Sequence, residues 1–291
     1  MANRHILITG AGGGLGRELA RTYAEPGIKL TLWGRDEAKL QPVAEACTAK
    51  GATVELVRED ARNLEACRNL LTSIDAQNPL DLAFLNAGVN SGTRPDGSME
   101  PPQDACRTIA VNALGTINLA AVLIERMLDR NAGQVVMTCS LAALYPLPDF
   151  AAYSASKKAV SYYARSMRAY AAKSKVKISL IYPGYMDTDM ARRLSGPQPQ
   201  TWSAEKSAVY IRKRLDAGAK TVIYPHFVAL GTFILNFLPP PFNDFFAKRF
   251  GFTVEPDAES KRFASADHNF GHESNLTSDK PSPDKGTSCG R

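Results

Sequence analysis

The sequence predicts a doubly wound α/β fold, in which one parallel sheet of seven strands has helices on both faces. Short apolar runs alternate with segments of helical spacing, and the runs are too continuous for strands with one wet face. Right-handed crossovers between parallel strands then place helices on both sides of the sheet. The expected strands are residues 5–9, 30–33, 53–57, 80–85, 134–138, 176–182 and 221–224.

The segments between these strands predict the rest of the organisation. Residues 15–24 and 151–172 have helical spacing, whereas 191–201 is rich in Pro, Gly and Gln and predicts a loop. We expect a single α/β domain over 1–225 and an apolar helical extension over 226–255. The polar tail 256–291 has few apolar anchors and is expected to be disordered.

Composition excludes several classes of protein. The 291 residues have a formal net charge of +6 without a Lys/Arg stripe, which argues against nucleic acid. The five cysteines are scattered and lack zinc-like spacing, so we expect no metal site and free thiols in a reducing compartment. An apolar strand that begins at residue 5 leaves no room for a signal peptide, and no apolar run approaches the ~20 residues of a membrane span. A cytoplasmic location is therefore expected.

A glycine-rich turn follows the first strand and precedes a helix. It comprises Gly10, Gly12, Gly13, Gly14, Leu15 and Gly16 after Thr9. Glycines allow a tight turn and close approach of the backbone to a pyrophosphate, and the free N–H groups of the helix N-terminus favour that anion. The strand–turn–helix context predicts a Rossmann-type dinucleotide site.

The end of the second strand bears on which dinucleotide binds there. A site that prefers NAD has an acid at this position, but here Gly34 occupies it and Arg35 follows. A guanidinium suits a 2′-phosphate, so NADP(H) is favoured over NAD. Asp36 would weaken this interpretation if the strand ended later, and Arg35 would then only begin a solvated turn.

Three residues predict proton-transfer chemistry. Tyr153 and Lys157 are four apart in a helical segment, which stacks their side chains on one face. A nearby ammonium lowers the pKa of a phenol, so the pair can exchange a proton with a carbonyl or alcohol oxygen. Ser140 follows the strand 134–138, at the sheet edge where ligands bind, and its hydroxyl can hydrogen-bond the same oxygen.

Taken together, these motifs resemble the short-chain dehydrogenase/reductase family. The spacing T-G-x-x-x-G-x-G is similar to its compact branch rather than its longer epimerase-like branch. Asn86, Ala87 and Gly88 match its Asn-Asn-Ala-Gly motif, with Leu85 in place of the first Asn. The similarity covers about residues 5 to 225.

The resemblance implies roles for further residues. Asn112 would support a water and proton relay to Lys157, or bond its own helix backbone instead. Asp60 would contact the adenine, or serve as a helix N-cap or strand-end turn. Pro183, Gly184 and Thr188 would lie along the nicotinamide, with the Thr on its amide or the phosphates. Tyr153 would protonate a carbonyl oxygen held by Ser140 during hydride transfer from NADPH, and Lys157 would also bond the nicotinamide ribose.

The substrate is expected to be a hydrophobic small molecule, because Leu141, Ala142, Leu144 and Tyr145 predict an apolar pocket together with the loop 191–201. Family resemblance implies a homodimer or homotetramer formed through the helices that contain Asn112 and Tyr153. The rival hypotheses are a catalytically silent NADP(H)-binding protein on the same fold and a membrane-surface protein on that fold, in which the Phe-rich end dominates function.

Residues 227–250 leave four alternatives open. An apolar stretch, 227–238, precedes three prolines, and Phe242, Phe245, Phe246 and Phe250 then share a helical face beside Lys248 and Arg249. The segment could pack on its own domain, line the pocket, form a subunit contact or lie on a membrane surface. His268 and His272 are four apart in the polar tail, where solvated side chains are expected rather than metal ligands.

Overall fold

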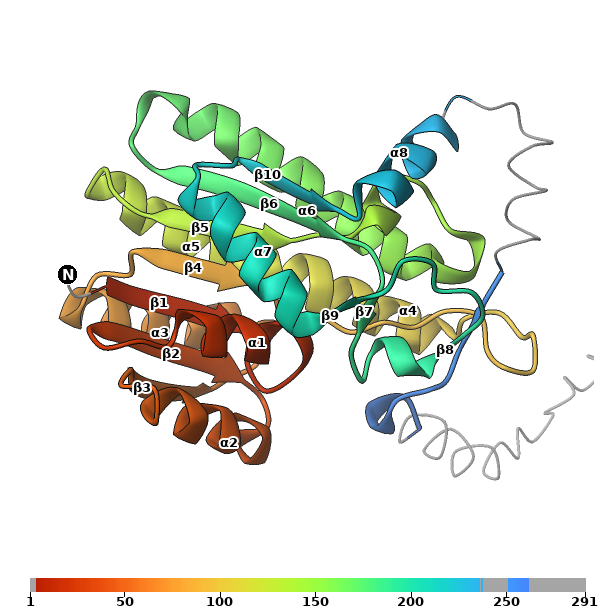
Figure 1. The fold of residues 1–291 in the computed structure, drawn as a ribbon, viewed down its shortest axis with the longest axis horizontal. Helices are drawn as coiled ribbons and strands as arrows, with labels where there is room; N and C mark the ends of the chain where they lie inside the picture. Colours follow the sequence, from red (N-terminus) through yellow and green to blue (C-terminus); the bar gives the residue numbers. More distant parts are fainter. Residues whose placement is uncertain (1–3, 236, 238–250, 262–291) are drawn as a thin grey trace, which may run out of the picture. The chain divides into compact units, whose positions relative to one another are not determined.

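A computed structural model describes residues 4–235, 237 and 251–261. It contains the predicted parallel sheet, with seven strands in the order β10-β6-β5-β4-β1-β2-β3 (Figure 1). Each end of a predicted strand lies within two residues of the observed end, and all six pairings are parallel. The strands are β1 (Arg4–Thr9), β2 (Ile28–Gly34), β3 (Thr53–Arg58), β4 (Leu82–Leu85), β5 (Gln134–Thr138), β6 (Lys177–Pro183) and β10 (Thr221–Tyr224).

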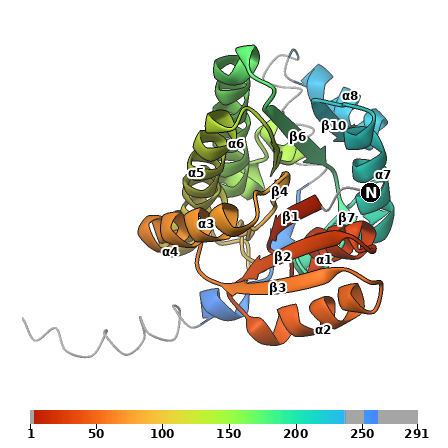
Figure 2. The same ribbon diagram turned by 90° about the vertical axis from the view of Figure 1, so that its left-hand side faces the viewer.

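Both faces of the sheet are covered, which explains the continuous apolar runs. Alternate residues of one strand enter different cores: Leu7 packs under one helical layer, whereas Ile6 and Ile8 pack under the other. The first layer holds α3 (Leu64–Gln77), α5 (Thr116–Asp129) and α6 (Ala151–Tyr170), and the second holds α1 (Gly14–Tyr23), α2 (Glu37–Thr48) and α7 (Ala204–Asp216). Figure 2 shows the sheet between α5 and α6 on one side and α1 and α7 on the other.

The strand order reverses between β1 and β4, which are neighbours in the sheet. Connections leave these two strands toward opposite faces, so a crevice forms at their carboxyl ends. The glycine-rich turn follows β1 and residues 86–88 follow β4. The topology therefore places the two predicted cofactor motifs side by side.

A long helical segment combines α4 (Pro102–Ile109), a π-helical stretch (Ala110–Gly115) and α5. By length and composition alone it could cross a membrane, contrary to the expectation that no run approaches that length. Because 67% of its apolar window is buried inside the protein, it is more simply explained as a core helix.

The part after β10 differs from a uniformly helical extension. Helix α8 (His226–Leu235) is followed, within the described residues, by the extended segment 251–255, which contains the short strand β11 (Thr253–Val254). The predicted loop 191–201 contains a 3₁₀ turn (Ala191–Arg193) and β8 (Leu194–Ser195), and the short strands β7 (Met186–Asp187) and β9 (Trp202–Ser203) flank this region. Residues 1–255 form one compact unit and 256–291 a second. Phe242, Phe245, Phe246, Phe250 and the tail from 262 lie outside the described residues.

Candidate active site

The glycine-rich turn forms a cradle at the N-terminus of α1. Gly10 and Gly14 have φ values of +66° and +50°, which L side chains rarely adopt. Gly13 is the N-cap and offers no side chain to cap the first turn, and a Cβ on it would meet nothing within 4 Å. The first N–H groups of a helix lack intrahelical partners, and no side chain caps them here, so this turn fits the pyrophosphate of a dinucleotide. The side chain of Leu15 is buried in the core, which leaves its backbone to serve the ligand.

Thr9 joins the two strand ends at the switch point, a role that the sequence analysis did not assign. Its hydroxyl oxygen accepts hydrogen bonds from the backbone N–H of Asn86 (2.9 Å) and Ala87 (3.1 Å). The side-chain amide of Asn86 donates to the Thr9 carbonyl at 3.4 Å. A Cβ on Gly10 would lie 2.9 Å from the Ala87 Cα, so the segment after β4 rests directly on the glycine turn. Leu85, which replaces a polar family residue, is buried in the core.

Tyr153 and Ser140 meet at the carboxyl edge of the sheet. Tyr153 lies in the first turn of α6, and Ser140 follows β5 and caps a 3₁₀ turn through a 3.1 Å bond from the Ala142 N–H. Burial raises the pKa of Tyr153 to about 12, and a hydrogen bond with Ser140 opposes that rise. We expected Lys157 to lower the pKa of Tyr153. In the protein without cofactor, burial has the larger effect and raises that pKa instead. The phenol is protonated at neutral pH.

Lys157 lies one turn after Tyr153 and is buried. Its Nζ donates to the Thr138 carbonyl at 3.0 Å and lies 5.8 Å from the centroid of the Tyr153 ring. Burial lowers the pKa of Lys157 to about 8. A Cβ on Gly88 would lie 3.4 Å from this Nζ, so Lys157 also faces the cofactor motif after β4. Lys157 and Gly88, which the sequence predicted as site residues, are therefore neighbours in the structure.

Asn112 connects the same motif to α6. It lies in the π-helical stretch, is fully buried, and accepts from the Val89 N–H at 2.8 Å. Its amide donates to the Val89 carbonyl at 2.9 Å and to the Ser156 hydroxyl at 3.1 Å. Asn112 therefore bonds residues outside its own helix, in contrast to the alternative that it bonds its own helix backbone. π-Helical turns are often found at functional sites, and here one directs Asn112 toward Gly88 and Lys157.

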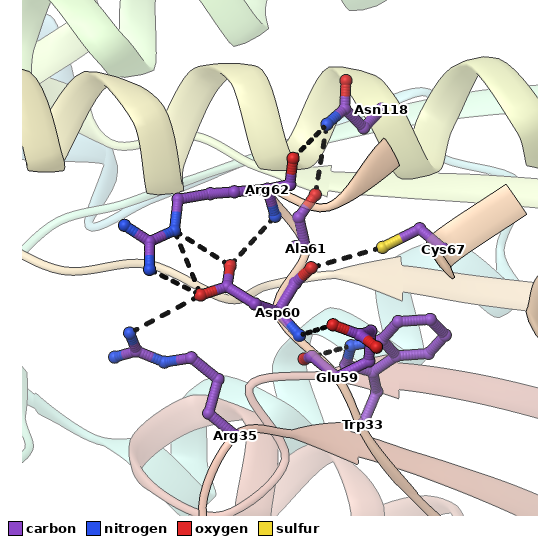
Figure 3. Close-up of polar contacts among 8 residues, drawn as sticks. All are labelled: Trp33, Arg35, Glu59, Asp60, Ala61, Arg62, Cys67 and Asn118. Atoms are coloured by element: carbon purple, nitrogen blue, oxygen red, sulfur yellow. Dashed lines mark hydrogen bonds and ion pairs between the residues drawn. The ribbon is translucent and has the colours of Figure 1, made fainter. Parts of the chain in front are cut away.

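Asp60 lies after β3 between two arginines (Figure 3). Arg62 holds its carboxylate with Nη2–Oδ2 at 2.6 Å, and the Arg62 N–H donates to Oδ1 at 2.9 Å. Arg35 Nη1 lies 3.9 Å from Oδ2. The hydrogen bonds from Arg62 are the largest effect on the pKa of Asp60 and lower it. Of the alternatives for Asp60, the strand-end turn forms, whereas the N-cap of α3 is Asn63.

The end of β2 places Arg35 directly after the strand. The strand ends at Gly34, and Asp36 is the N-cap residue of α2, so Asp36 does not occupy the strand-end acid position. Sequence analysis missed Arg62, because only folding shows that it and Arg35 converge on Asp60.

Residues 183–188 reach the glycine turn from β6. Pro183 pairs with Tyr224 in β10, and the Gly184 N–H donates to the Tyr224 carbonyl at 2.8 Å. A Cβ on Gly14 would lie 3.2 Å from the Thr188 Cγ2. Thr188 therefore faces the pyrophosphate cradle. Among the described residues, no group of three His, Cys, Asp or Glu side chains could hold a metal ion. His268 and His272 lie outside those residues.

Comparison with known proteins agrees with this arrangement. The family model for short chain dehydrogenases matches residues 4–198. An uncharacterised oxidoreductase of Myxococcus xanthus is 31% identical over 250 residues, which cover 86% of this chain and 98% of the relative. The 2,3-dihydro-2,3-dihydroxybenzoate dehydrogenase of Bacillus subtilis is 28% identical and covers 71% of this chain, which in turn covers 76% of that enzyme.

A solved structure shows the same architecture. The short chain dehydrogenase/reductase of Burkholderia phymatum, in complex with NAD, is 25% identical and superposes with a TM-score of 0.71. It covers 88% of this chain, and this chain covers 98% of it. The chain belongs to the short chain dehydrogenase family. It is an oxidoreductase of the class that acts on alcohol and carbonyl groups.

Proposed function

We propose that this protein is an NADP(H)-dependent oxidoreductase that interconverts a carbonyl and a secondary alcohol on a hydrophobic small molecule. One observation supports the chemistry most strongly: the Tyr153 phenol interacts with Ser140, and buried Lys157 places its Nζ 5.8 Å from the centroid of the same ring. These groups lie at the same sheet edge as a glycine cradle that fits a dinucleotide.

Each residue has a distinct task in this proposal. A bound reduced nicotinamide supplies the hydride. Tyr153, whose pKa is raised to about 12, stays protonated at neutral pH and donates its proton to the carbonyl oxygen. Ser140 donates a hydrogen bond to that oxygen as negative charge develops on it. Lys157, which donates to the Thr138 carbonyl, places a cation close to the phenolate that remains after Tyr153 gives up its proton. Asn112 supports the reprotonation of Tyr153 through water.

The preference for NADP(H) rests on this chain's own residues, because the Burkholderia relative holds NAD. Gly34 replaces the strand-end acid, and the Arg35 side chain beside it is 45% exposed. Arg62, 36% exposed, contacts the same carboxylate, so two guanidinium groups lie together where β2 and β3 end. Guanidinium groups suit a 2′-phosphate.

The experiment is a fluorescence titration with NADPH and with NADH on the wild type and Arg35→Asp. We expect tight NADPH binding that weakens at least tenfold in the variant, while NADH binding improves. Lys177→Asp is a matched control, because that exposed side chain lies at the first residue of β6, at the opposite edge of the sheet from the glycine turn. Equal affinity of the wild type for both nucleotides would refute the NADP(H) preference.

The alternative, a catalytically silent nucleotide-binding protein, predicts a different result. Such a protein would bind NADPH yet oxidise none of it with any carbonyl. Retention of Ser140, Tyr153 and Lys157 in contact geometry argues against it. A screen of hydrophobic ketones and aldehydes for NADPH consumption separates the two.

Self-association through α6 and the long helix of Asn112 is proposed as well. Exposed apolar side chains on these helices support it: Ile109, Leu114, Tyr162 and Tyr170. Size-exclusion chromatography with light scattering is expected to give a dimer or tetramer. A monomer at micromolar concentration would contradict this proposal.

Peripheral membrane contact is a second proposal, alongside a cytoplasmic location. Helix α8 buries none of its residues, and Phe227 and Phe233 are 77% and 57% exposed. An uncharged helix with exposed Phe side chains suits the interface of a bilayer. Co-sedimentation with anionic liposomes is expected to drop in Phe227→Ser/Phe233→Ser, and unchanged sedimentation would refute the contact.

A further inference from the structure

The C-terminal strap, defined as residues 251–255, returns to the catalytic part of the chain. Its strand β11 pairs antiparallel with β8, with Val254 opposite Leu194. The Val254 N–H donates to the Thr93 carbonyl at 2.7 Å, and the Glu255 N–H donates to the Arg193 carbonyl at 2.8 Å. The strap is therefore fixed by backbone bonds to two separate loops. It lies beyond residue 198, where the family match ends.

Asp149 ties the strap to the beginning of the catalytic helix. This residue lies in a 3₁₀ turn (Pro148–Phe150) directly before α6. Its Oδ2 accepts from the Phe252 N–H at 3.1 Å, and its Oδ1 accepts from the Thr93 hydroxyl at 3.0 Å. One carboxylate thus joins the strap, the loop after β4 and the turn that leads to Tyr153.

Three aromatic rings continue this connection to the reacting group. The rings of Phe252 and Phe150 meet edge to face, with centroids 4.6 Å apart. The Phe150 ring lies 4.8 Å from the ring of Tyr153. Phe252 and Phe150 are only 7% and 5% exposed, and they form one apolar cluster against which Tyr153 packs.

The cluster has little free space. A Cβ on Gly92 would lie 2.8 Å from the Val254 Cγ2 and 2.9 Å from the Phe150 Cδ2. Removing a ring from such a closely packed cluster leaves a cavity into which its neighbours can move.

We propose that Phe252 is a positioning residue for Tyr153: through Phe150, it holds the phenol ring in place and makes the strap part of the active site. This inference rests on the proposed function for its consequence in catalysis, but the contact itself does not. Proton transfer requires hydrogen-bond reach between the Tyr153 hydroxyl and the substrate oxygen. A displacement of about 1 Å can cost on the order of 100-fold in rate.

The test compares Phe252→Ala with Phe252→Leu, which restores most of the volume. Val209→Ala is the control, since it removes an exposed apolar side chain from α7, a helix of the other layer. The first readout is the ionisation of Tyr153, which is monitored by phenolate absorbance during a pH titration. The absorbance of the same protein with the additional substitution Tyr153→Phe is subtracted, so that only the Tyr153 signal remains. Opening the cavity admits water, which lowers the pKa of Tyr153 from about 12 toward its ordinary value of ~10.

We therefore expect Tyr153 to ionise at a lower pH in Phe252→Ala than in the wild type, Phe252→Leu or Val209→Ala. The second readout is turnover of the best carbonyl substrate, with active protein counted by NADPH-binding stoichiometry. We expect kcat to fall 10- to 100-fold in Phe252→Ala, with at most a twofold change in NADPH affinity, and to recover largely in Phe252→Leu.

Three outcomes separate this inference from the proposed function. Unchanged ionisation of Tyr153 in Phe252→Ala would overturn the inference, whether or not the enzyme is active. A shifted ionisation with unchanged kcat would overturn the catalytic role of the strap. A shifted ionisation in a protein that reduces no carbonyl would support the positioning contact and refute the proposed function instead.

Discussion

Substituting Gly16 by Ala tests whether the turn after β1 is built as tightly as the structure shows. A Cβ on Gly16 would lie 2.2 Å from the Gly10 carbonyl oxygen and 2.8 Å from its carbon. This is roughly 1 Å short of ordinary contact, and the obstacle is backbone, so the strand end and α1 must separate. Overpacking of this kind costs about 1–3 kcal/mol, and the better helix propensity of Ala returns about 1 kcal/mol.

Because the obstacle is backbone at 2.2 Å, the cost lies at the upper end, about 3 kcal/mol, and the net loss is about 2 kcal/mol. A loss of this size lowers Tm by about 4–8 °C in a domain of this size. NADPH affinity is expected to fall at least tenfold, because the separated turn no longer aligns the α1 N-terminus with the pyrophosphate. Differential scanning fluorimetry and nucleotide titration measure both effects.

Gly13→Ala is the matched control in the same turn. Its φ of −163° suits any residue, and its Cβ would meet nothing within 4 Å. The Tm of Gly13→Ala should therefore stay close to the wild-type value. If Gly16→Ala has the same Tm as Gly13→Ala, the close approach of α1 to the strand end is wrong.

Two further predictions concern the buried polar groups of the site. Burial lowers the pKa of Lys157 from 10.5 to about 8, so below pH 8 the folded protein holds a buried ammonium at a cost on the order of 3 kcal/mol. Lys157→Met should therefore be the more stable protein in urea unfolding at pH 7, and its advantage should shrink between pH 8 and 10.5; an advantage that does not change with pH would contradict this. Asn112→Ala leaves the Val89 N–H and carbonyl unpaired, so we expect a loss of about 3 kcal/mol and a Tm lower by about 6–12 °C. A drop below 2 °C on the same Tm scale would show that water replaces the amide.

Much of the fold was predictable because its signals are local. Strands covered on both faces, such as 134–138, are continuous apolar runs without polar alternation. In the helices between them, apolar residues recur with helical spacing. The glycine turn, Tyr153 and Lys157 were predictable for the same reason, since each motif lies within a few residues of one element. Family resemblance then indicated Asn112 and Thr188 at positions that the structure brings to the site.

The remaining contacts depend on chain segments that are distant in sequence. Arg62 and Arg35 converge on Asp60 only because β2 and β3 are neighbours in the sheet. Phe252 meets Phe150 across 102 positions because the next two residues, Thr253 and Val254, pair with β8. Both strands have two residues and are too short to leave a periodic pattern. The Tyr153 pKa was expected to fall because Lys157 is close in sequence, but burial has the larger effect and depends on the whole packed edge.

The most direct test of the proposed chemistry is a comparison of Tyr153→Phe with the wild type in NADPH consumption on hydrophobic carbonyls. The variant keeps the ring contact with Phe150 and loses only the hydroxyl. We predict unchanged NADPH affinity and a loss of turnover of about 100- to 10,000-fold, the range expected for removal of a general acid. Turnover within tenfold of the wild type would contradict the assignment of Tyr153 as the proton donor.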